Sequence, residues 1–451
     1  MADDTIQGVK DSAKLGPALA TLLVAGNMIG SGVFLLPATL AVIGSISLIG
    51  WAVAGLGALL LAAVFSALVI LRPDIDGVAD YASAGFGRYA GFQSGFAYWM
   101  SNWTGTVAVA VAVTGYLTVF VPALHKPMAS ALGSIAIIWL LILFNIIGPR
   151  FVGKLSGLTL AAGLLPVGGV ALFGWFWFEP KLFLDAWNPA GLPAATAVQR
   201  SLVLVFWAYT GMESAIVAAK VVRRPERNVP IATIGGVAFA TVIFMLTSAA
   251  IAGVVPDKAL AASAAPYAAA AARALGPWAA GLVTVCALLK TAGTAAGITL
   301  LTGETTRASA ATGYFPKFLA RVRPNGAPVT ALLFLGVLMT VTLVLSISPT
   351  VGRQFAALID VSTVLTLVMY GWCALAVLRI AGAIASPAWR TATRAAALGA
   401  FGFCVWVVAT SEPKLLLLSL AVLAATLPLW GLVLLAKRAR ADKTASSGAA
   451  I

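Results

Sequence analysis

Long apolar segments separated by short polar gaps occupy almost the whole chain. A helix needs about 20 apolar residues to cross the ~30 Å hydrocarbon core of a bilayer, and lipid offers the backbone no hydrogen-bond partners. The pattern therefore predicts an all-α integral membrane protein. Its twelve predicted spans are residues 15–37, 46–71, 91–122, 128–148, 152–177, 199–221, 230–255, 277–305, 328–346, 354–382, 393–411 and 414–436.

Short polar tails flank these spans. Residues 1–13 and 437–451 lie outside a predicted transporter domain of residues 14–436. The first tail has neither the apolar core nor the small-residue cleavage site of a signal peptide, so we expect the first span to be retained. Composition agrees with this organisation, because only 10% of the residues are charged and the mean hydropathy is +0.99. Soluble domains contain about 25% charged residues, so a soluble globular protein is excluded.

The net charge of +14 raises nucleic acid as a partner, but the basic residues lie in the gaps between spans. With a cytoplasmic N-terminus, 21 of the 29 Lys and Arg fall on the cytoplasmic side, seven on the other side and one, Lys290, inside a span. Cytoplasmic loops are enriched in Lys and Arg, so we expect both termini in the cytoplasm. The bilayer explains the charge without nucleic acid.

Conventional enzyme chemistry has few candidate residues here. The three cysteines lie in apolar runs and the chain has a single histidine. These numbers exclude a disulfide framework, a clustered metal site and histidine-based nucleophilic catalysis. The sequence predicts a protein that is not an enzyme and has no metal or cofactor.

Two predicted spans contain helix-disfavouring stretches at corresponding positions. Residues 26–32 (GNMIGSG) place three glycines in span 1, and residues 207–214 (WAYTGMES) lie in span 6. Each glycine in a helix costs about 1 kcal/mol relative to alanine, although small residues also allow close packing of membrane helices. Because the two spans have opposite orientation, the pairing favours a five-plus-five inverted repeat of residues 15–177 and 199–382. Residues 393–436 would be peripheral, and the class would be a secondary transporter.

The backbone groups freed at such breaks have opposite polarity. A helix N-terminus binds anions, so N–H groups of Ser31 and Gly32 would bind a carboxylate. Carbonyls of Met28, Trp207 and Thr210 would accept hydrogen bonds from an ammonium group. The pair is complementary to an α-amino acid, or to another zwitterion.

Polar and ionisable residues mark a cavity beside these breaks. Tyr98, Asn102 and Thr106 recur every four residues and share one helical face. Glu213, Lys290 and Asp360 lie inside spans, where a charge costs at least ~2.5 kcal/mol and usually faces a pathway or proton site. The alternatives are packing for each aromatic residue, and a buried ion pair, such as one between Lys290 and Asp360, for the charges.

Four stretches give the chain a family resemblance: residues 30–38 (GSGVFLLPA), 173–178 (FGWFWF), 207–213 (WAYTGME) and 227–237 (RNVPIATIGGV). From about residue 15 to about residue 435 it resembles the basic amino acid/polyamine antiporters of the amino acid-polyamine-organocation superfamily, with the bacterial arginine/agmatine antiporters as the nearest group. The resemblance implies a homodimer in the inner membrane that exchanges an external amino acid for an internal amine.

The same resemblance assigns roles to particular residues. The substrate carboxylate would meet Ser31 and Gly32, and its amine would meet the carbonyls of Met28, Trp207 and Thr210. Trp207 would shape the pocket, Ser362 would contact the substrate, and Tyr98 and Glu213 would act in gating and in the response to pH.

Four residues depart from the family pattern in ways that concern specificity. Ile298 replaces a tryptophan that stacks on the guanidinium group, which removes a cation–π contact worth up to ~2 kcal/mol. Asn102 and Thr106 replace a cysteine and an asparagine, and Lys290 replaces a glycine. Lys290 would brace the broken span 1 through its carbonyls, as sodium does in sodium-coupled members of this fold, carry a proton, or bind a substrate carboxylate.

We therefore expect an antiporter that exchanges arginine or another basic amino acid for an amine such as agmatine. One alternative keeps the fold and exchanges neutral amino acids without sodium, with Lys290 as a fixed cation. A different class is an amine-gated channel or membrane sensor, which would need no exchangeable substrate inside a vesicle.

Overall fold

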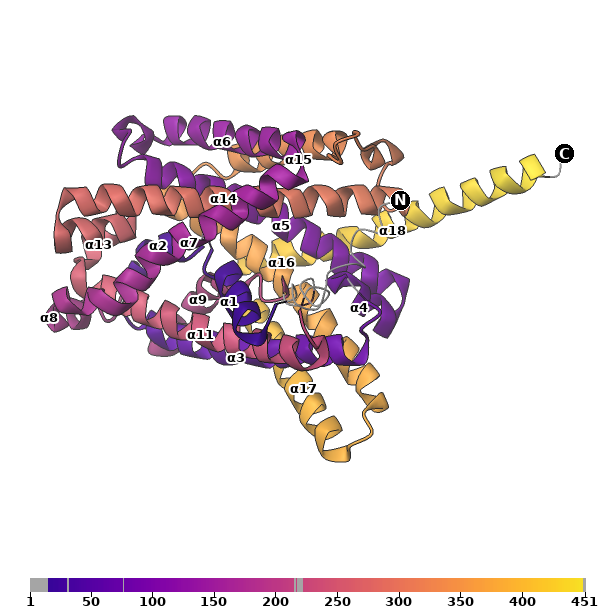
Figure 1. Cartoon of the computed structure of the whole chain (residues 1–451), viewed down its shortest axis with the longest axis horizontal. Coiled ribbons are helices and arrows are strands. Elements are labelled where there is room, and N and C mark those ends of the chain that lie inside the picture. The colour runs from indigo at the N-terminus through magenta and orange to yellow at the C-terminus, as the bar shows by residue number, and fades with distance from the viewer. Residues whose placement is uncertain (1–14, 31, 76, 215, 217–221, 449–451) are drawn as a thin grey trace.

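The computed structural model describes residues 15–30, 32–75, 77–214, 216 and 222–448, with residues 436–448 described by their backbone alone. Within these ranges the regular structure is helical, apart from one isolated parallel bridge between Leu15 and Val222. Most long helices lie side by side in an elongated bundle, and the last helix projects beyond it (Figure 1). The all-α prediction is confirmed.

Among the described residues, eight helices are long and apolar enough to cross a membrane. Most of them start at a proline, whose fixed φ and missing N–H suit the first turn of a helix. The eight are α3 (Ser47–Leu71), α6 (Pro127–Ile147), α7 with η3 (Pro149–Trp177), α11 (Pro225–Val254), α14 (Pro277–Ala311), α16 with η7 (Val351–Ala383), α17 (Pro387–Ala409) and the Pro413–Leu435 part of α18 (Pro413–Gly448).

The first predicted span consists of two helices. Helix α1 (Pro17–Met28) and helix α2 (Gly32–Ala41) meet at a bend of 48°, and together they form a ninth candidate span. The glycine-rich stretch thus lies where regular helix stops. Ser31, the predicted carboxylate ligand in this break, lies outside the described residues.

Three further helices occupy the remaining predicted spans. Helix α15 (Val329–Leu345) is apolar but has only 17 residues. Helix α5 (Arg88–Leu117) has 30 residues, yet its polar positions keep it out of the apolar set. Helix α9 (Ala194–Phe206) has 13 residues and is followed by the short helix η4 (Trp207–Tyr209). Thr210 is then extended, and Gly211 has φ of 99°, a conformation that favours glycine.

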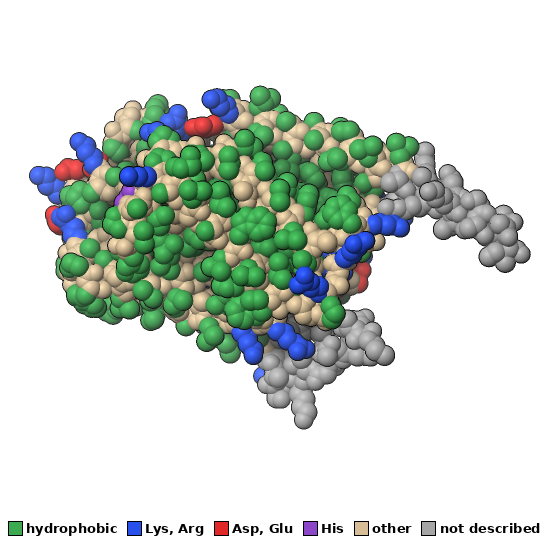
Figure 2. All heavy atoms as spheres, turned by 90° about the horizontal axis from the view of Figure 1, so that it is seen from above, with side chains coloured by type: hydrophobic (Ala, Val, Ile, Leu, Met, Phe, Trp, Pro, Cys, Tyr) green, Lys and Arg blue, Asp and Glu red, His purple; other side chains and the backbone are tan. Residues whose placement is uncertain are grey.

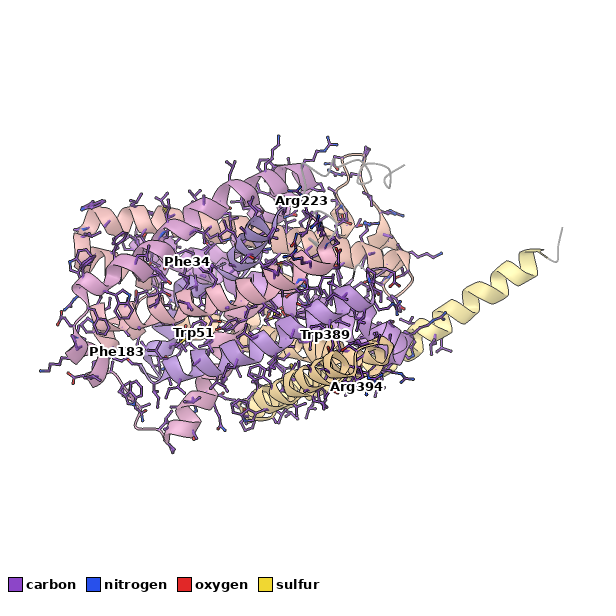
Figure 3. The ribbon with its side chains drawn as sticks, turned by 60° about the horizontal axis from the view of Figure 1, so that its bottom comes forward. Phe34, Trp51, Phe183, Arg223, Trp389 and Arg394 are labelled. Atoms are coloured by element: carbon purple, nitrogen blue, oxygen red, sulfur yellow. The ribbon has the colours of Figure 1, made fainter. Side chains whose placement is uncertain are left out.

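The two ends of the bundle differ in their short helices. Helices α8 (Pro180–Asp185) and α13 (Pro266–Leu275) lie at one end, and helix α4 (Val78–Phe86) lies at the other (Figure 1). On the face drawn in Figure 2, hydrophobic side chains cover the middle and charged side chains lie toward the ends. In Figure 3, Arg223 and Arg394 lie toward the end opposite Phe183.

Helices α5 and α16 form the centre of the molecule. In the apolar window of α16, 72% of the residues are buried, against 17% in α18, so α16 belongs to the core and α18 to the periphery. The largest fully buried side chains are aromatic, among them Phe34 and Trp51, which lie within the bundle in Figure 3. This packing leaves a large cavity, described next.

Candidate functional site

A cavity of about 600 Å³ lies where α1, α2, η4, α5, α7, α14 and α16 meet. Ligand pockets for small molecules have volumes of roughly 300–1,000 Å³, so the cavity has room for an amino acid or a diamine. Its described lining consists of Leu23, Asn27, Met28, Gly30, Gly32, Tyr98, Ser101, Asn102, Ser156, Gly157, Leu160, Trp207, Ala208, Thr210, Gly211, Glu213, Ser214, Lys290, Gly293, Thr294, Gly297, Ile298, Leu301, Ser362 and Thr366.

The structure brings nearly all the predicted site residues to this one cavity. Thr106 is different, because it is fully buried and donates its hydroxyl hydrogen to the Asn102 carbonyl, 2.9 Å away in its own helix. Asp360 does not line the cavity either. The predicted residues on the wall are Met28, Gly32, Tyr98, Asn102, Trp207, Thr210, Glu213, Lys290, Ile298 and Ser362.

Glu213 is the carboxylate of the cavity wall, and three donors hold it. The Tyr98 hydroxyl donates to Oε1 at 3.1 Å, the Tyr370 hydroxyl donates to Oε2 at 2.5 Å, and the backbone N–H of Gly211 donates to Oε2 at 3.0 Å. Hydrogen bonds to a carboxylate are about twice as strong as those between neutral groups. Glu213 thereby links the break after α9 to helices α5 and α16.

Tyr370 is a site residue that the sequence analysis missed. Ser362, Thr366 and Tyr370 recur every four residues on α16, the same spacing that singled out Tyr98 and Asn102 on α5. The spacing was therefore available in the sequence. Its partner was not, because Glu213 lies 157 positions earlier in the chain.

Trp207 forms part of the cavity wall between two glycines. A Cβ atom on Gly32 of α2 would lie 2.6 Å from Cδ1 and Nε1 of the indole, and a Cβ atom on Gly105 of α5 would lie 2.5 Å from Cη2. Real Cβ contacts are longer, so both helices approach the ring more closely than any other residue type would permit. The two glycines fix opposite edges of the indole.

Lys290 is buried, with 5% of its surface exposed, and its Nζ donates to the Gly26 carbonyl of α1 at 3.1 Å. A Cβ atom on Gly163 of α7 would lie 2.2 Å from the lysine Cγ, so this glycine makes room for the aliphatic stem. Among the described residues no carboxylate forms an ion pair with Lys290, and the pair with Asp360 that the sequence allowed is not seen.

Ser362 bonds to α5 rather than standing free in the cavity. Its hydroxyl donates to the Ser101 carbonyl at 2.8 Å, and the Ser101 hydroxyl contacts Ser362 Oγ at 2.9 Å and Thr366 Oγ1 at 2.5 Å. This cluster joins the two central helices directly beside the cavity. Ser101, another lining residue, was missed because it lies off the Tyr98–Asn102 face.

The described lining residues together give the cavity one carboxylate, one ammonium group, an indole wall and a helix break. Such a site suits a small molecule that carries both charge and apolar length. A cavity of this kind within a bundle of apolar helices is typical of membrane transporters of small charged molecules.

Comparison with known proteins agrees with this class. The family model described as amino acid permease matches residues 15–431. The putrescine transporter PotE of Escherichia coli is 34% identical over 359 residues, which cover 80% of this chain and 82% of that protein. The cadaverine/lysine antiporter of Escherichia coli is 34% identical over 379 residues, covering 83% and 85%, and the putrescine transporter PotE of Haemophilus influenzae is 32% identical over 407 residues, covering 90% and 94%. The chain belongs to the amino acid permease family, among its basic amino acid and polyamine antiporters.

Proposed function

We propose that the protein is an antiporter that exchanges a basic amino acid for the amine formed by its decarboxylation. The observation that carries the proposal is the 600 Å³ cavity with Glu213 in its wall, because this carboxylate can pair with an ammonium group of either substrate. The relatives support it, since one is named a cadaverine/lysine antiporter and others are named putrescine transporters.

The proposed transport mechanism is alternating access in the cytoplasmic membrane. Twelve spans would form two inverted repeats, residues 15–177 and 199–382, with breaks in the first span of each. The 48° bend between α1 and α2 and the end of regular helix at Phe206 support this arrangement. Arg223 and Arg394 lie toward the same end of the bundle, in accord with cytoplasmic termini. By family resemblance, the protein would be a homodimer.

In this mechanism the breaks bind the α-carboxylate and the α-ammonium group of the amino acid. Backbone N–H groups at Ser31 and Gly32 would bind the carboxylate of the amino acid. Carbonyls of Met28, Trp207 and Thr210 would bind its α-ammonium group. The Tyr98–Glu213 contact would couple substrate binding and pH to the closing of the cavity.

Which amino acid and amine are exchanged depends on the residues that would contact the side-chain end of the substrate. Arginine and agmatine fit the family resemblance, but Ile298 offers no aromatic face to a guanidinium group. Lysine with cadaverine, and ornithine with putrescine, need no such stacking. We therefore extend the proposal to all three pairs of basic amino acid and decarboxylated amine.

One observation favours a second candidate, a sodium-independent exchanger of neutral amino acids. Lys290 adds a positive charge to the cavity wall opposite in sign to Glu213, so the charges on the described lining residues cancel. A neutral zwitterion would then bind without adding net charge to a low-dielectric site.

Reconstituted vesicles test both candidates. Vesicles loaded with arginine, lysine, ornithine, their amines, or neutral amino acids are each given labelled substrate outside. We expect uptake only into vesicles loaded with a basic amino acid or its amine. Uptake into empty vesicles would instead indicate a channel, and exchange restricted to neutral amino acids would favour the second candidate.

A further inference from the structure

Lys290 retains donor capacity that its known contact does not use. An ammonium group has three N–H donors, and among the described residues the only acceptor bonded to Nζ is the Gly26 carbonyl. A buried donor without a partner costs about 1–3 kcal/mol. Because Lys290 lines the cavity, its free donors are placed to meet a ligand there.

Thr294, one turn further along α14, shows the same unused capacity. Helix α14 contains seven threonines, and six of them donate their hydroxyl hydrogen to the carbonyl four residues earlier. Thr294 does not. Its buried Oγ1 has no partner among the described residues. By analogy with the other six threonines, the expected acceptor is the Lys290 carbonyl, four residues earlier. The hydroxyl hydrogen of Thr294 therefore has no acceptor among the described residues.

Both residues lie next to the break in the first span. Lys290 contacts Gly26 on α1, and a Cβ atom on Gly30 would lie 3.5 Å from the Thr294 methyl carbon. Residues four apart on a helix have Cβ atoms about 5–6 Å apart, so one carboxylate can accept hydrogen bonds from both side chains. Gly163 of α7 leaves room for the aliphatic stem of Lys290. The stem therefore lies against α7, while the ammonium group contacts α1.

We propose that Lys290 and Thr294 complete, from the α14 side, the subsite for the α-carboxylate of an amino acid, whose other side would be the backbone N–H groups at the break in the first span. The inference rests on the proposed function and adds a basis for choosing between the two exchanged substrates. The amino acid fills the subsite, whereas its decarboxylated amine leaves the ammonium group of Lys290 without an anion and adds two positive charges to the cavity. The amino acid consequently binds more tightly than its amine.

The competing explanation is that Lys290 only braces the structure by tying α14 to the Gly26 carbonyl of α1. Under that explanation, loss of the lysine weakens both substrates alike, and the Thr294 hydroxyl has no role. The two explanations therefore differ in the ratio of the affinities and in the effect of Thr294.

L-lysine and cadaverine are suitable probes because they differ only in the carboxylate. Binding to the purified full-length protein is measured from the ligand-induced rise in its melting temperature, which needs no transport. We expect Thr294→Val to weaken lysine binding about tenfold and Lys290→Met to weaken it by roughly ten- to a hundredfold, with cadaverine binding unchanged or stronger. Thr299→Val is the matched control, because Thr299 is fully buried in the same helix and bonds to the Ala295 carbonyl.

Equal losses for lysine and cadaverine in both variants would overturn the subsite, as would a Thr294→Val variant that matches Thr299→Val. The valine variant is nearly isosteric and decides the question if Lys290→Met fails to fold. Leucine and 3-methylbutylamine, which also differ only in the carboxylate, repeat the comparison for a neutral amino acid. The test of the subsite therefore does not depend on which substrate pair is exchanged. Failure of exchange in vesicles would refute the proposed function, whereas the affinity ratio refutes or supports the subsite.

Discussion

At the scale of single residues, Trp207 has the largest side chain among the described residues that line the cavity. Replacing it with alanine removes a ring whose contacts with a ligand are worth on the order of 1–3 kcal/mol. We expect Trp207→Ala to weaken substrate binding about ten- to a hundredfold at normal expression, measured by ligand-induced stabilisation. Unchanged affinity would place the substrate elsewhere in the molecule. A loss of protein yield alone would identify a packing residue.

Glu213 is the second residue whose role is open to direct test. Its carboxylate joins Tyr98 of α5 to Tyr370 of α16, and neutralising it weakens both contacts. We expect Glu213→Gln to flatten the pH dependence of exchange, measured in vesicles with equal pH on both sides. Tyr370→Phe keeps the carboxylate and removes one donor, so it should alter the rate while preserving a pH response. An unaltered profile in Glu213→Gln would leave Glu213 a structural role only.

The sequence identified the residues of the site better than their partners. Helical spacing and intramembrane charge singled out Tyr98, Glu213 and Lys290 without any structure. It could not reveal that Tyr370 contacts Glu213, because the two residues are 157 positions apart. Only the family resemblance suggests that Lys290 meets carbonyls of span 1, and the acceptor in the structure is the Gly26 carbonyl, 264 positions away. Contacts at such distances depend on how helices pack, which local patterns do not specify.

At the scale of elements, hydropathy predicts the helices, but it does not predict where two helices approach each other closely. Apolar length and initial prolines predict most of the long helices, because lipid and chain geometry act on each segment alone. By contrast, Gly105 lies in an unremarkable part of span 3. Its importance depends on the Trp207 ring, which arrives from a helix about a hundred positions later.

Gly105 therefore gives a prediction about helix packing. Alanine favours a helix by about 1 kcal/mol over glycine, so Gly105→Ala should not weaken α5 itself. The added Cβ would lie 2.5 Å from Trp207 Cη2. The indole ring cannot move away from it toward α2, because Gly32 already lies against the opposite edge of the ring. We expect the ring to shift into the cavity and to raise the substrate KM about tenfold by narrowing the space available.

A smaller ring at position 207 should relieve this collision. We expect Trp207→Phe to restore part of the KM lost in Gly105→Ala, although the phenylalanine change alone weakens binding. Gly95→Ala is the control in the same helix, since its Cβ would make only an ordinary 3.4 Å contact with Ala79. If the effects of the two substitutions on KM simply add in the double variant, the proposed position of the ring between Gly32 and Gly105 is contradicted.

At the scale of the whole molecule, the cavity lies nearer one end of the bundle. Its wall uses residues up to Asn102 of α5 and Leu160 of α7 and residues from Lys290 onward in α14, so it reaches from the middle of these helices toward that end. In the proposed topology all three segments lie toward the cytoplasm. A different part of the bundle is filled by three fully buried aromatic residues, Phe34, Tyr116 and Tyr267.

These aromatic residues join α2, α5 and α13. The Tyr116 hydroxyl donates to the Phe34 carbonyl at 2.9 Å, and the rings of Phe34 and Tyr267 have centroids 5.2 Å apart. Because α13 lies at the end of the bundle opposite α4, the cluster lies on the predicted external side of the cavity. Alternating access requires these helices to separate so that substrate can enter from outside.

The last prediction tests this closure with a thiol in the cavity. Asn102→Cys places a reactive group on the wall, and an impermeant maleimide reports which side reaches it. We expect labelling from the cytoplasmic side of oriented vesicles and slow labelling from outside. Tyr116→Phe removes the hydrogen bond to Phe34, so we expect external labelling to rise several-fold, in line with a net hydrogen-bond contribution of about 1 kcal/mol. Fast external labelling of the parent, unaffected by Tyr116→Phe, would show that the aromatic cluster does not close the cavity.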